Sequence, residues 1–409
     1  MLALGRLFAV VSCLLVAGVA QAQTLPAEQA LNARGLTRAW WGRAHIDPSQ
    51  DTVQFLSADE TVLYVQSRTG GLTAFDAETG KRMWIRQLGP SIQAGFRANS
   101  NDTEVLVSAG MVLFSLDKLT GKTNWTLQLP HHPSSAPGVD DNNVYVPMSD
   151  SSVYQFDLRT IHKLSDAGML PQWSLRARGW RYQTARPVLS PPSSDNTLVT
   201  FASSSGTLYA VNAQGVKLKF QFEAGSPITT PVAYRGDTIY ICDVAGQVYC
   251  ISAVTGVTRW TFSTSSPVRF QPRPVDDAVF VVAERGGLYS LDNQTGVQNW
   301  RNVNVTNFVS VSNERVYAAD ELGNILILNR KTGKPEAPSL SVRDFPIRIS
   351  NSRTDRLYLG TKDGLVVCIR ETGLTQPIYH LYPDRRPILP ELAPDEDAAA
   401  TTEAAPANN

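Results

Sequence analysis

The sequence of 409 residues predicts an all-β protein, an eight-bladed β-propeller, and three observations support this prediction. A motif of the form Asp-x-x-Thr-Gly, closed by a Trp, recurs along the chain. Its copies are spaced by about 40 residues. Each copy contains short runs of β-branched or alternating apolar residues, which are typical of strands. A repeat near this length, built from short strands, is typical of propeller blades, which bury their faces against their neighbours.

The motif copies set the number of blades. The strongest copies contribute the structural residues Asp76, Gly80, Trp84, Asp117, Gly121, Trp125, Gly256, Trp260, Asp292, Gly296 and Trp300. In all copies, strong and weak, the third motif residue stands at 76, 117, 157, 212, 252, 292, 329 and 370, with steps of 41, 40, 55, 40, 40, 37 and 41. Eight copies predict eight blades.

Each conserved position of the repeat has a physical role. The Asp carboxylate can accept N–H groups of the turn, and the Gly supplies a positive φ that a side chain would resist. The closing Trp is expected between blades, where its burial stabilises most. In the copy at Asp157 we expect Trp173 to be this residue, displaced by an insertion, and in the copy at Asn212 we expect Phe220.

The ring must also close. Residues 37–42, Thr-Arg-Ala-Trp-Trp-Gly, form an isolated Trp-containing strand before the first full unit, and the eighth copy lacks a Trp. We therefore predict that this N-terminal strand completes the last blade, with residues 377–380 as an alternative outer strand. The predicted propeller covers residues 37–382, after a lead-in over 23–36.

The two ends predict export and disorder. Residues 1–22 contain Arg6, an apolar run from Leu7 to Val19 and the sequence Ala20-Gln21-Ala22, which indicates a cleaved signal peptide. A lipoprotein signal with Cys13 as the lipidated residue is the alternative. Residues 383–409 are rich in Pro, Ala and acidic side chains, most strongly from Pro394 onward, and predict a disordered tail. No other apolar run is long enough to span a membrane.

The repeat resembles that of a known family. Residues 74–84 match the pattern Ala-x-Asp-x-x-Thr-Gly-x-x-x-Trp of PQQ-type propellers, a family that includes quinoprotein alcohol dehydrogenases and the outer-membrane assembly factor BamB. The resemblance covers about residues 37 to 380. It implies the fold strongly and the activity weakly, because the motif residues serve turns and packing. The length and the single sizeable insertion resemble BamB more than the longer dehydrogenases, and the adjacent Cys pair typical of the dehydrogenases is absent.

The cysteines and histidines predict no metal or cofactor site. Cys250 and Cys368 occupy a small motif position that is expected to be buried. A two-residue turn at Ala245-Gly246 would place Cys242 opposite Tyr249, so that the sulfurs of Cys242 and Cys250 point to opposite faces. A bulge at Gly246 would instead allow a disulfide. The histidines lack ligand spacing and are expected at the surface or in turns: His45, His131, His132, His162 and His380.

One segment departs from the repeat and is the candidate partner-binding site. About 15 extra residues lie between Asp157 and Asn212. The candidate residues are Arg176, Arg178, Trp180, Arg181 and Tyr182, with Arg186 close by, because Arg, Trp and Tyr are enriched in binding hot spots. In the alternative, Trp180 and Tyr182 pack on the neighbouring blade while the arginines are solvated.

Composition and resemblance together predict a binding protein. The chain has 37 Lys+Arg and 37 Asp+Glu, so it has no basic excess for nucleic acid. The leading prediction is a monomeric, non-catalytic scaffold without cofactors. It would be periplasmic or attached to the outer membrane, and would bind protein partners, as the resemblance to BamB implies for outer-membrane protein assembly. The alternatives are a small quinoprotein with PQQ and calcium, and a ligand-sensing propeller with a polar central funnel.

Overall fold

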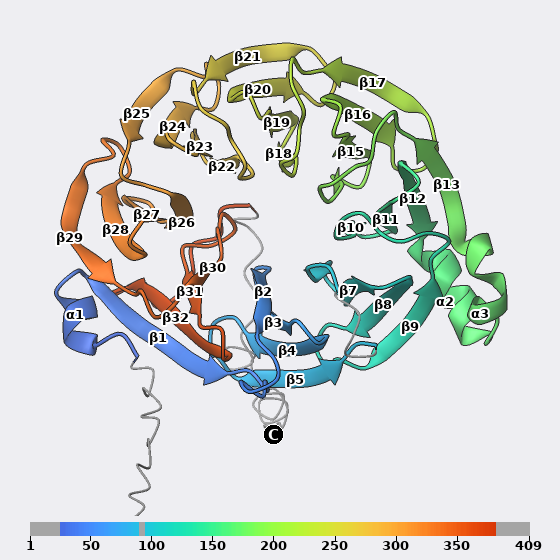
Figure 1. Ribbon diagram of the computed structural model, residues 1–409, viewed down its shortest axis with the longest axis horizontal. Coiled ribbons are helices and arrows are strands. Elements are labelled where there is room, and N and C mark those ends of the chain that lie inside the picture. The colour runs from blue at the N-terminus through green and yellow to red at the C-terminus, as the bar shows by residue number, and fades with distance from the viewer. Residues whose placement is uncertain (1–24, 90–94, 382–409) are drawn as a thin grey trace, which may run out of the picture.

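A computed structural model describes residues 25–89 and 95–381, which form a closed ring of eight four-stranded antiparallel sheets (Figure 1). This architecture confirms the eight-bladed propeller. The predicted signal peptide, Cys13 and the predicted tail over 383–409 lie outside the described residues.

The blades follow the chain in order, and in each of the first seven the strands run from the centre outward. Blade 1 contains β2 (Val53–Ala58), β3 (Val62–Ser67), β4 (Gly71–Asp76) and β5 (Arg82–Gln87); blade 2 contains β6 (Asn99–Ser100), β7 (Glu104–Ala109), β8 (Val112–Asp117) and β9 (Thr123–Gln128). Blade 3 contains β10 (Gly138–Val139), β11 (Asn143–Met148), β12 (Ser152–Asp157) and β13 (Arg178–Gln183); blade 4 contains β14 (Ser193–Ser194), β15 (Leu198–Ala202), β16 (Thr207–Asn212) and β17 (Leu218–Glu223). Blade 5 contains β18 (Ala233–Arg235), β19 (Thr238–Cys242), β20 (Gln247–Ser252) and β21 (Thr258–Ser263); blade 6 contains β22 (Arg273–Val275), β23 (Ala278–Ala283), β24 (Gly287–Asp292) and β25 (Gln298–Asn302). Blade 7 contains β26 (Asn307–Val311), β27 (Arg315–Ala319), β28 (Asn324–Asn329) and β29 (Pro335–Ser341).

Blade 8 joins the two ends of the ring. It contains β30 (Ile347–Arg348), β31 (Leu357–Gly360), β32 (Leu365–Glu371) and, outermost, β1 (Leu36–Arg43). Strands β1 and β32 are antiparallel, from Leu36 opposite Glu371 to Arg43 opposite Leu365 (Figure 1). The predicted closure by the N-terminal strand is therefore confirmed. The alternative outer strand over 377–380 is wrong, since that segment contributes only an isolated bridge between Tyr379 and Thr354.

In the described part of the chain, four short helical segments lie outside the ring. Helix α1 (Glu28–Asn32) precedes β1. Helices α2 (Leu158–Asp166) and α3 (Leu170–Trp173) and a 3₁₀ turn (Ser174–Ala177) lie between β12 and β13. Figure 1 shows them at the rim beside β13 and β9. They form the insertion that the 55-residue step predicts.

The repeat motif joins each blade to the next through its Trp and its Gly. Trp84 of blade 1 lies on Gly121 of blade 2 so closely that a Cβ on the glycine would be 2.4 Å from the indole ring. The Trp84 Nε1 donates to the carbonyl of Lys118, at 2.9 Å. Equivalent bonds run from Trp40 to Ala77, from Trp260 to Asn293 and from Trp300 to Arg330. The motif is therefore a unit of inter-blade packing as well as a turn.

The motif aspartates Asp117 and Asp292 cap their turns as predicted. The Oδ1 of Asp117 accepts from the backbone N of Thr120 at 2.7 Å and from its hydroxyl at 2.7 Å. The hydroxyl bond and then the backbone bond lower the pKa of Asp117. Asp292 is held in the same way by Thr295, and its pKa is lowered too.

The hairpin that carries two cysteines differs from its prediction. Cys242 lies opposite Val248 and not Tyr249, because Asp243 pairs with Gln247 and leaves a three-residue loop over 244–246. The Asp243 carboxylate stabilises this loop by accepting from the backbone N of Gln247 at 2.8 Å. The predicted opposite orientation is therefore wrong: Cys242 and Cys250 belong to one apolar cluster on one face, offset by two residues, and both thiols are free.

Candidate functional site

The insertion of blade 3 is a folded projection. At the end of β12, Asp157 caps a helix instead of a turn, since its Oδ1 accepts from the backbone N of Thr160 at 2.7 Å. One side of the insertion is buried against blades 2 and 3 through Leu158, Ile161, Leu170 and Ala177. These contacts hold the remaining side chains on a firm base.

Two of the predicted binding residues are structural. Trp180 of β13 lies opposite Gln155 of β12 and is 6% exposed. Its Nε1–H donates to the carbonyl of Ala213 in blade 4, at 3.2 Å. Trp180 is therefore the closing Trp of blade 3, and the prediction of Trp173 for that role is wrong because β13 begins only at Arg178. Tyr182 packs on two aromatic rings of blade 4, with centroid distances of 5.6 and 5.3 Å. Both residues pack between blades, as the alternative prediction states.

The predicted arginines lie in three different settings. Arg181 lies against the blade, with Nη2 at 3.0 Å from Oδ2 of Asp150 and 2.6 Å from Oε1 of Gln183. Arg176 stacks on the ring of Trp173, with its guanidinium carbon 3.5 Å from the ring centroid. Arg178 is exposed at the start of β13, and Arg186 lies beyond the strand and is exposed as well.

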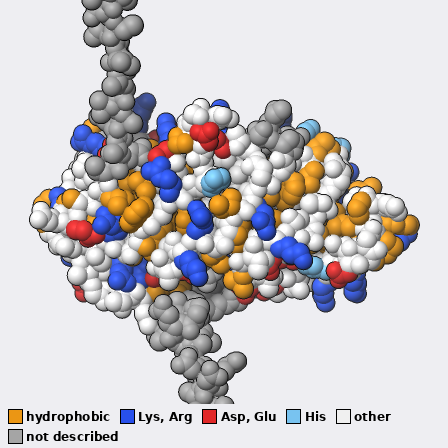
Figure 2. All heavy atoms as spheres, turned by 90° about the horizontal axis from the view of Figure 1, so that it is seen from below, with side chains coloured by type: hydrophobic (Ala, Val, Ile, Leu, Met, Phe, Trp, Pro, Cys, Tyr) orange, Lys and Arg blue, Asp and Glu red, His pale blue; other side chains and the backbone are white. Residues whose placement is uncertain are grey.

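Three exposed apolar side chains lie near Arg176 in the sequence of the insertion. We call these residues together the insertion tip: Met169, Trp173, Leu175 and Arg176. Trp173 is 37% exposed and Leu175 is 58% exposed. Figure 2 shows hydrophobic side chains at this end of the molecule, at the right, with Lys and Arg beside them. The sequence reasoning missed Met169 and Leu175, although apolar residues inside an insertion that interrupts the repeat were a usable signal.

The histidines are not all at the surface. His380 is buried, and its Nε2 donates to the carbonyl of Val311 at 2.9 Å, while its Nδ1 lies 3.6 Å from Oδ2 of Asp276. The surface or turn prediction is wrong for His380, because the segment after β32 returns to the inner part of the ring. His162 is half-exposed and contacts Glu104, with Nε2 to Oε1 at 2.5 Å.

A polar cavity of about 260 Å³ lies at the centre of the ring. Inner strands and adjoining loops of blades 1 to 6 and of blade 8 line it. Its charged side chains are Asp59, Arg97, Arg273 and Arg353. A quinoprotein would need free carboxylates here for calcium. Asp59, however, already binds Lys118 at 2.9 Å and Ser100 at 2.5 Å. Residues 25–89 and 95–381 also contain no group of three or more His, Cys, Asp or Glu that could hold a metal ion. The carboxylate of Asp59 is therefore already engaged within the protein.

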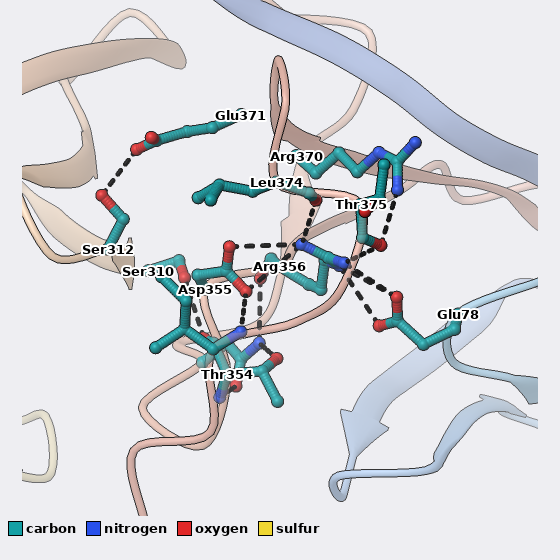
Figure 3. A network of polar contacts seen from close by, with 12 residues as sticks. Glu78, Ser310, Ser312, Thr354, Asp355, Arg356, Arg370, Glu371, Leu374 and Thr375 are labelled. Carbon is teal, nitrogen blue, oxygen red and sulfur yellow. Dashed lines mark hydrogen bonds and ion pairs between the residues drawn. The ribbon is translucent and has the colours of Figure 1, made fainter. Parts of the chain in front are cut away.

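A buried ion network joins blade 8 to blade 1 (Figure 3). The fully buried Arg356 contacts Glu78 of blade 1, with Nη2 to Oε2 at 2.9 Å, and Asp355 of its own blade at 3.2 Å. It also donates to the carbonyl of Thr375 at 3.0 Å. Burial raises the pKa of both Glu78 and Asp355. The network holds blade 8 against blade 1 where the ring closes, and its charged groups are paired with one another.

Comparisons with known proteins agree with the fold. The sequence model of a family described as outer membrane protein assembly factor BamB matches residues 68–221 and 219–338. A search of curated proteins found no match. None of the helices in the described part of the chain is long and apolar enough to cross a membrane.

Three solved structures show the same kind of architecture. BamB from Moraxella catarrhalis has a TM-score of 0.63 at 16% identity, covering 82% of this chain and 99% of that one. The computationally designed Ika8 protein has a TM-score of 0.59 at 15% identity, covering 80% and 98%. The Pan2 WD40 domain of Neurospora crassa has a TM-score of 0.51 at 10% identity, covering 82% and 95%. At these identities the likeness shows the fold alone.

Proposed function

Since the chain belongs to the family of the outer membrane protein assembly factor BamB, we propose that it is a non-catalytic scaffold of the cell envelope that binds protein partners in outer-membrane protein assembly. The signal peptide that the sequence predicts over residues 1–22 supports the location. The engagement of Asp59 by Lys118 and Ser100 leaves this carboxylate less available to a calcium ion and so supports binding over quinone chemistry.

The insertion tip is the single observation that carries the proposal. It presents Trp173, Leu175 and Arg176 on a base that is packed into blades 2 and 3. Trp and Arg dominate the binding energy of many protein interfaces, and a preorganised stack loses little conformational freedom when a partner binds. We therefore assign partner binding to the insertion tip and not to Trp180 and Tyr182. Arg178 lies at the edge of this tip.

Site-specific photo-crosslinking in intact cells tests the proposal. A photoreactive residue at Leu175 should capture a component of the outer-membrane barrel assembly machinery. The same residue at Val257, which is 64% exposed on blade 5, should capture markedly less. Equal capture at both positions, or none from the folded, exported protein, would overturn the proposal.

Substitutions then separate binding from folding. Trp173→Ala and Arg176→Glu should each weaken capture several-fold without lowering the melting temperature, because both side chains lie at the surface and outside the apolar cluster that holds the insertion. Arg159→Glu, an exposed change on α2 of the same insertion, is the matched control and should leave capture unchanged.

A further inference from the structure

Three arginines converge on the central cavity. Arg97 precedes β6 in blade 2, Arg273 begins β22 in blade 6, and Arg353 follows β30 in blade 8. Their positions in sequence are far apart, and only the closed ring brings them to one space. The family motif does not contain them, and the proposed partner surface lies elsewhere, on the rim.

The charges of this cavity do not balance. Arg353 contacts Glu60, with Nη1 to Oε2 at 3.2 Å, and Asp59 contacts Lys118 at 2.9 Å. Arg97 and Arg273 have no carboxylate partner anywhere in the described ranges 25–89 and 95–381. Two positive charges therefore remain uncompensated within a cavity of about 260 Å³.

The pKa values of Arg97 and Arg273 also indicate that these guanidinium groups lack a counter-charge among the described residues. Burial, and then the positive charges of Arg97 and Arg353, lower the pKa of Arg273 to about 10, so it remains protonated at neutral pH. Arg97 is exposed to the open cavity, and partial desolvation by the surrounding ring lowers its pKa as well. Charges held inside a protein normally have a counter-charge, because an unpaired one is costly to remove from water.

We propose that the central cavity binds a small multivalent anion, either a polycarboxylate or a phosphate, held by Arg97 and Arg273. A guanidinium group presents a planar set of donors that matches both kinds of anion. The hydroxyl groups of Ser193 and Ser352 line the same space and can complete the coordination of the ligand. The volume admits a small metabolite but not a folded partner. This site makes the protein a ligand-binding propeller whether or not the insertion tip binds a partner.

Calorimetric titration of the exported protein tests the site, with citrate and inorganic phosphate as probes and acetate as the monovalent control. All titrations are run at one ionic strength, because salt screens such interactions. Citrate, phosphate or both should bind, and acetate should not. Arg273→Gln and Arg97→Gln should each weaken binding by about tenfold or more, as expected for loss of a charge-assisted hydrogen bond. Arg285→Gln, which removes an exposed charge from the same blade as Arg273, should leave binding unchanged.

The melting temperature without anion distinguishes a binding residue from a structural one. Arg273→Gln relieves repulsion with Arg97 and Arg353, so it should melt at or above the wild-type temperature and should lose the stabilisation that citrate or phosphate gives the wild type. A lowered melting temperature together with unchanged anion affinity would overturn the proposal. So would the absence of binding by both probes.

The acidic C-terminal residues provide a last test. If citrate binds only to a variant with Glu391→Gln, Asp395→Asn, Glu396→Gln and Asp397→Asn, the chain itself is the occupant and the small-anion proposal is wrong. Equal citrate affinity in this variant and the wild type supports the proposal. Neither result depends on capture at the insertion tip, so the two proposals can fail separately.

Discussion

At the residue scale, the glycine of the repeat has two separate duties. Gly121 has a φ of +67°, and its Cα faces the indole of Trp84 without room for a Cβ. Gly373 occupies the same motif position in blade 8 with a φ of +90°, but no atom lies within 4 Å of its Cβ position. The second site has no aromatic neighbour because blade 7 carries no closing Trp.

Alanine at these two glycines should separate the duties. Gly373→Ala should lower the free energy of unfolding by about 1 kcal/mol, because alanine there adds only the strain of a positive φ. Gly121→Ala should cost about 3 kcal/mol or more, because Trp84 must also move. Urea unfolding of both variants measures the difference, and equal losses would show that the contact with the Trp adds nothing.

Trp125 shows what happens when the motif is interrupted. Its Nε1 is buried without a hydrogen-bond partner among the described residues. The equivalent acceptor would be the carbonyl of Leu158, one residue after Asp157. That residue begins helix α2, where carbonyls are used within the helix. The insertion therefore destabilises the interface of blades 2 and 3 locally, because it leaves the Nε1 of Trp125 without an acceptor in the described part of the chain.

At the element scale, β1 and α1 complete the packing at the interfaces of blade 8 with blades 1 and 7. Trp40 of β1 packs on Gly80 and donates to Ala77 at 2.9 Å, so it replaces the Trp that the eighth copy lacks. Leu31 of α1 is fully buried in the cluster between blades 7 and 8, where no Trp is present. Two short elements near the N-terminus thus complete two interfaces.

Two adjacent tryptophans allow a direct test of this closure. Trp40 is 7% exposed, and Trp41 is 54% exposed. Trp40→Ala should destabilise the protein by about 3–5 kcal/mol, because it leaves a cavity at the closing interface. Trp41→Ala should change the unfolding free energy little, since its side chain points to solvent. Similar unfolding midpoints for the two variants would argue against closure through β1.

At the scale of the whole molecule, charged side chains hold neighbouring blades in place. Asp276 of blade 6 contacts Arg235 of blade 5 at 3.3 Å, Arg330 of blade 7 at 2.9 Å, and His380 after blade 8 at 3.6 Å. The contact with His380 and then that with Arg330 keep the pKa of Asp276 well below its usual range. One carboxylate therefore links three blades and the last described segment.

The depressed pKa of Asp276 predicts a pH dependence with a definite sign. A carboxyl whose pKa is lower in the folded state stabilises the fold above its ordinary pKa of about 4, and this stabilisation is lost as the pH falls toward the folded value. Asp276→Asn should therefore lower the melting temperature by a few degrees at pH 7 and by somewhat less at pH 3, and the difference from the wild type should shrink further at lower pH. Asp277→Asn, at a side chain that is 86% exposed, is the control and should have little effect at either pH. A loss for Asp276→Asn that does not vary with pH would contradict this role.

The number of blades, the residues of the turns and the closing strand could be predicted from the sequence alone. Seven of the eight third strands end at the predicted motif residue, from β4 at Asp76 to β28 at Asn329, because the Asp or Asn cap and the Gly act within a few residues of one another. Trp40 was likewise recognisable as an unmatched copy of the motif's Trp. The family resemblance rested on the same local pattern.

Features that depend on residues far apart in the sequence could not be predicted in this way. Trp180 rather than Trp173 closes blade 3, because the acceptor that selects it lies in blade 4. The cysteine register depended on a carboxylate cap, and the burial of His380 depended on where the chain returns to the ring. Arg97 and Arg273 carry no local motif, since a site assembled from inner strands of separate blades exists only after the ring has closed.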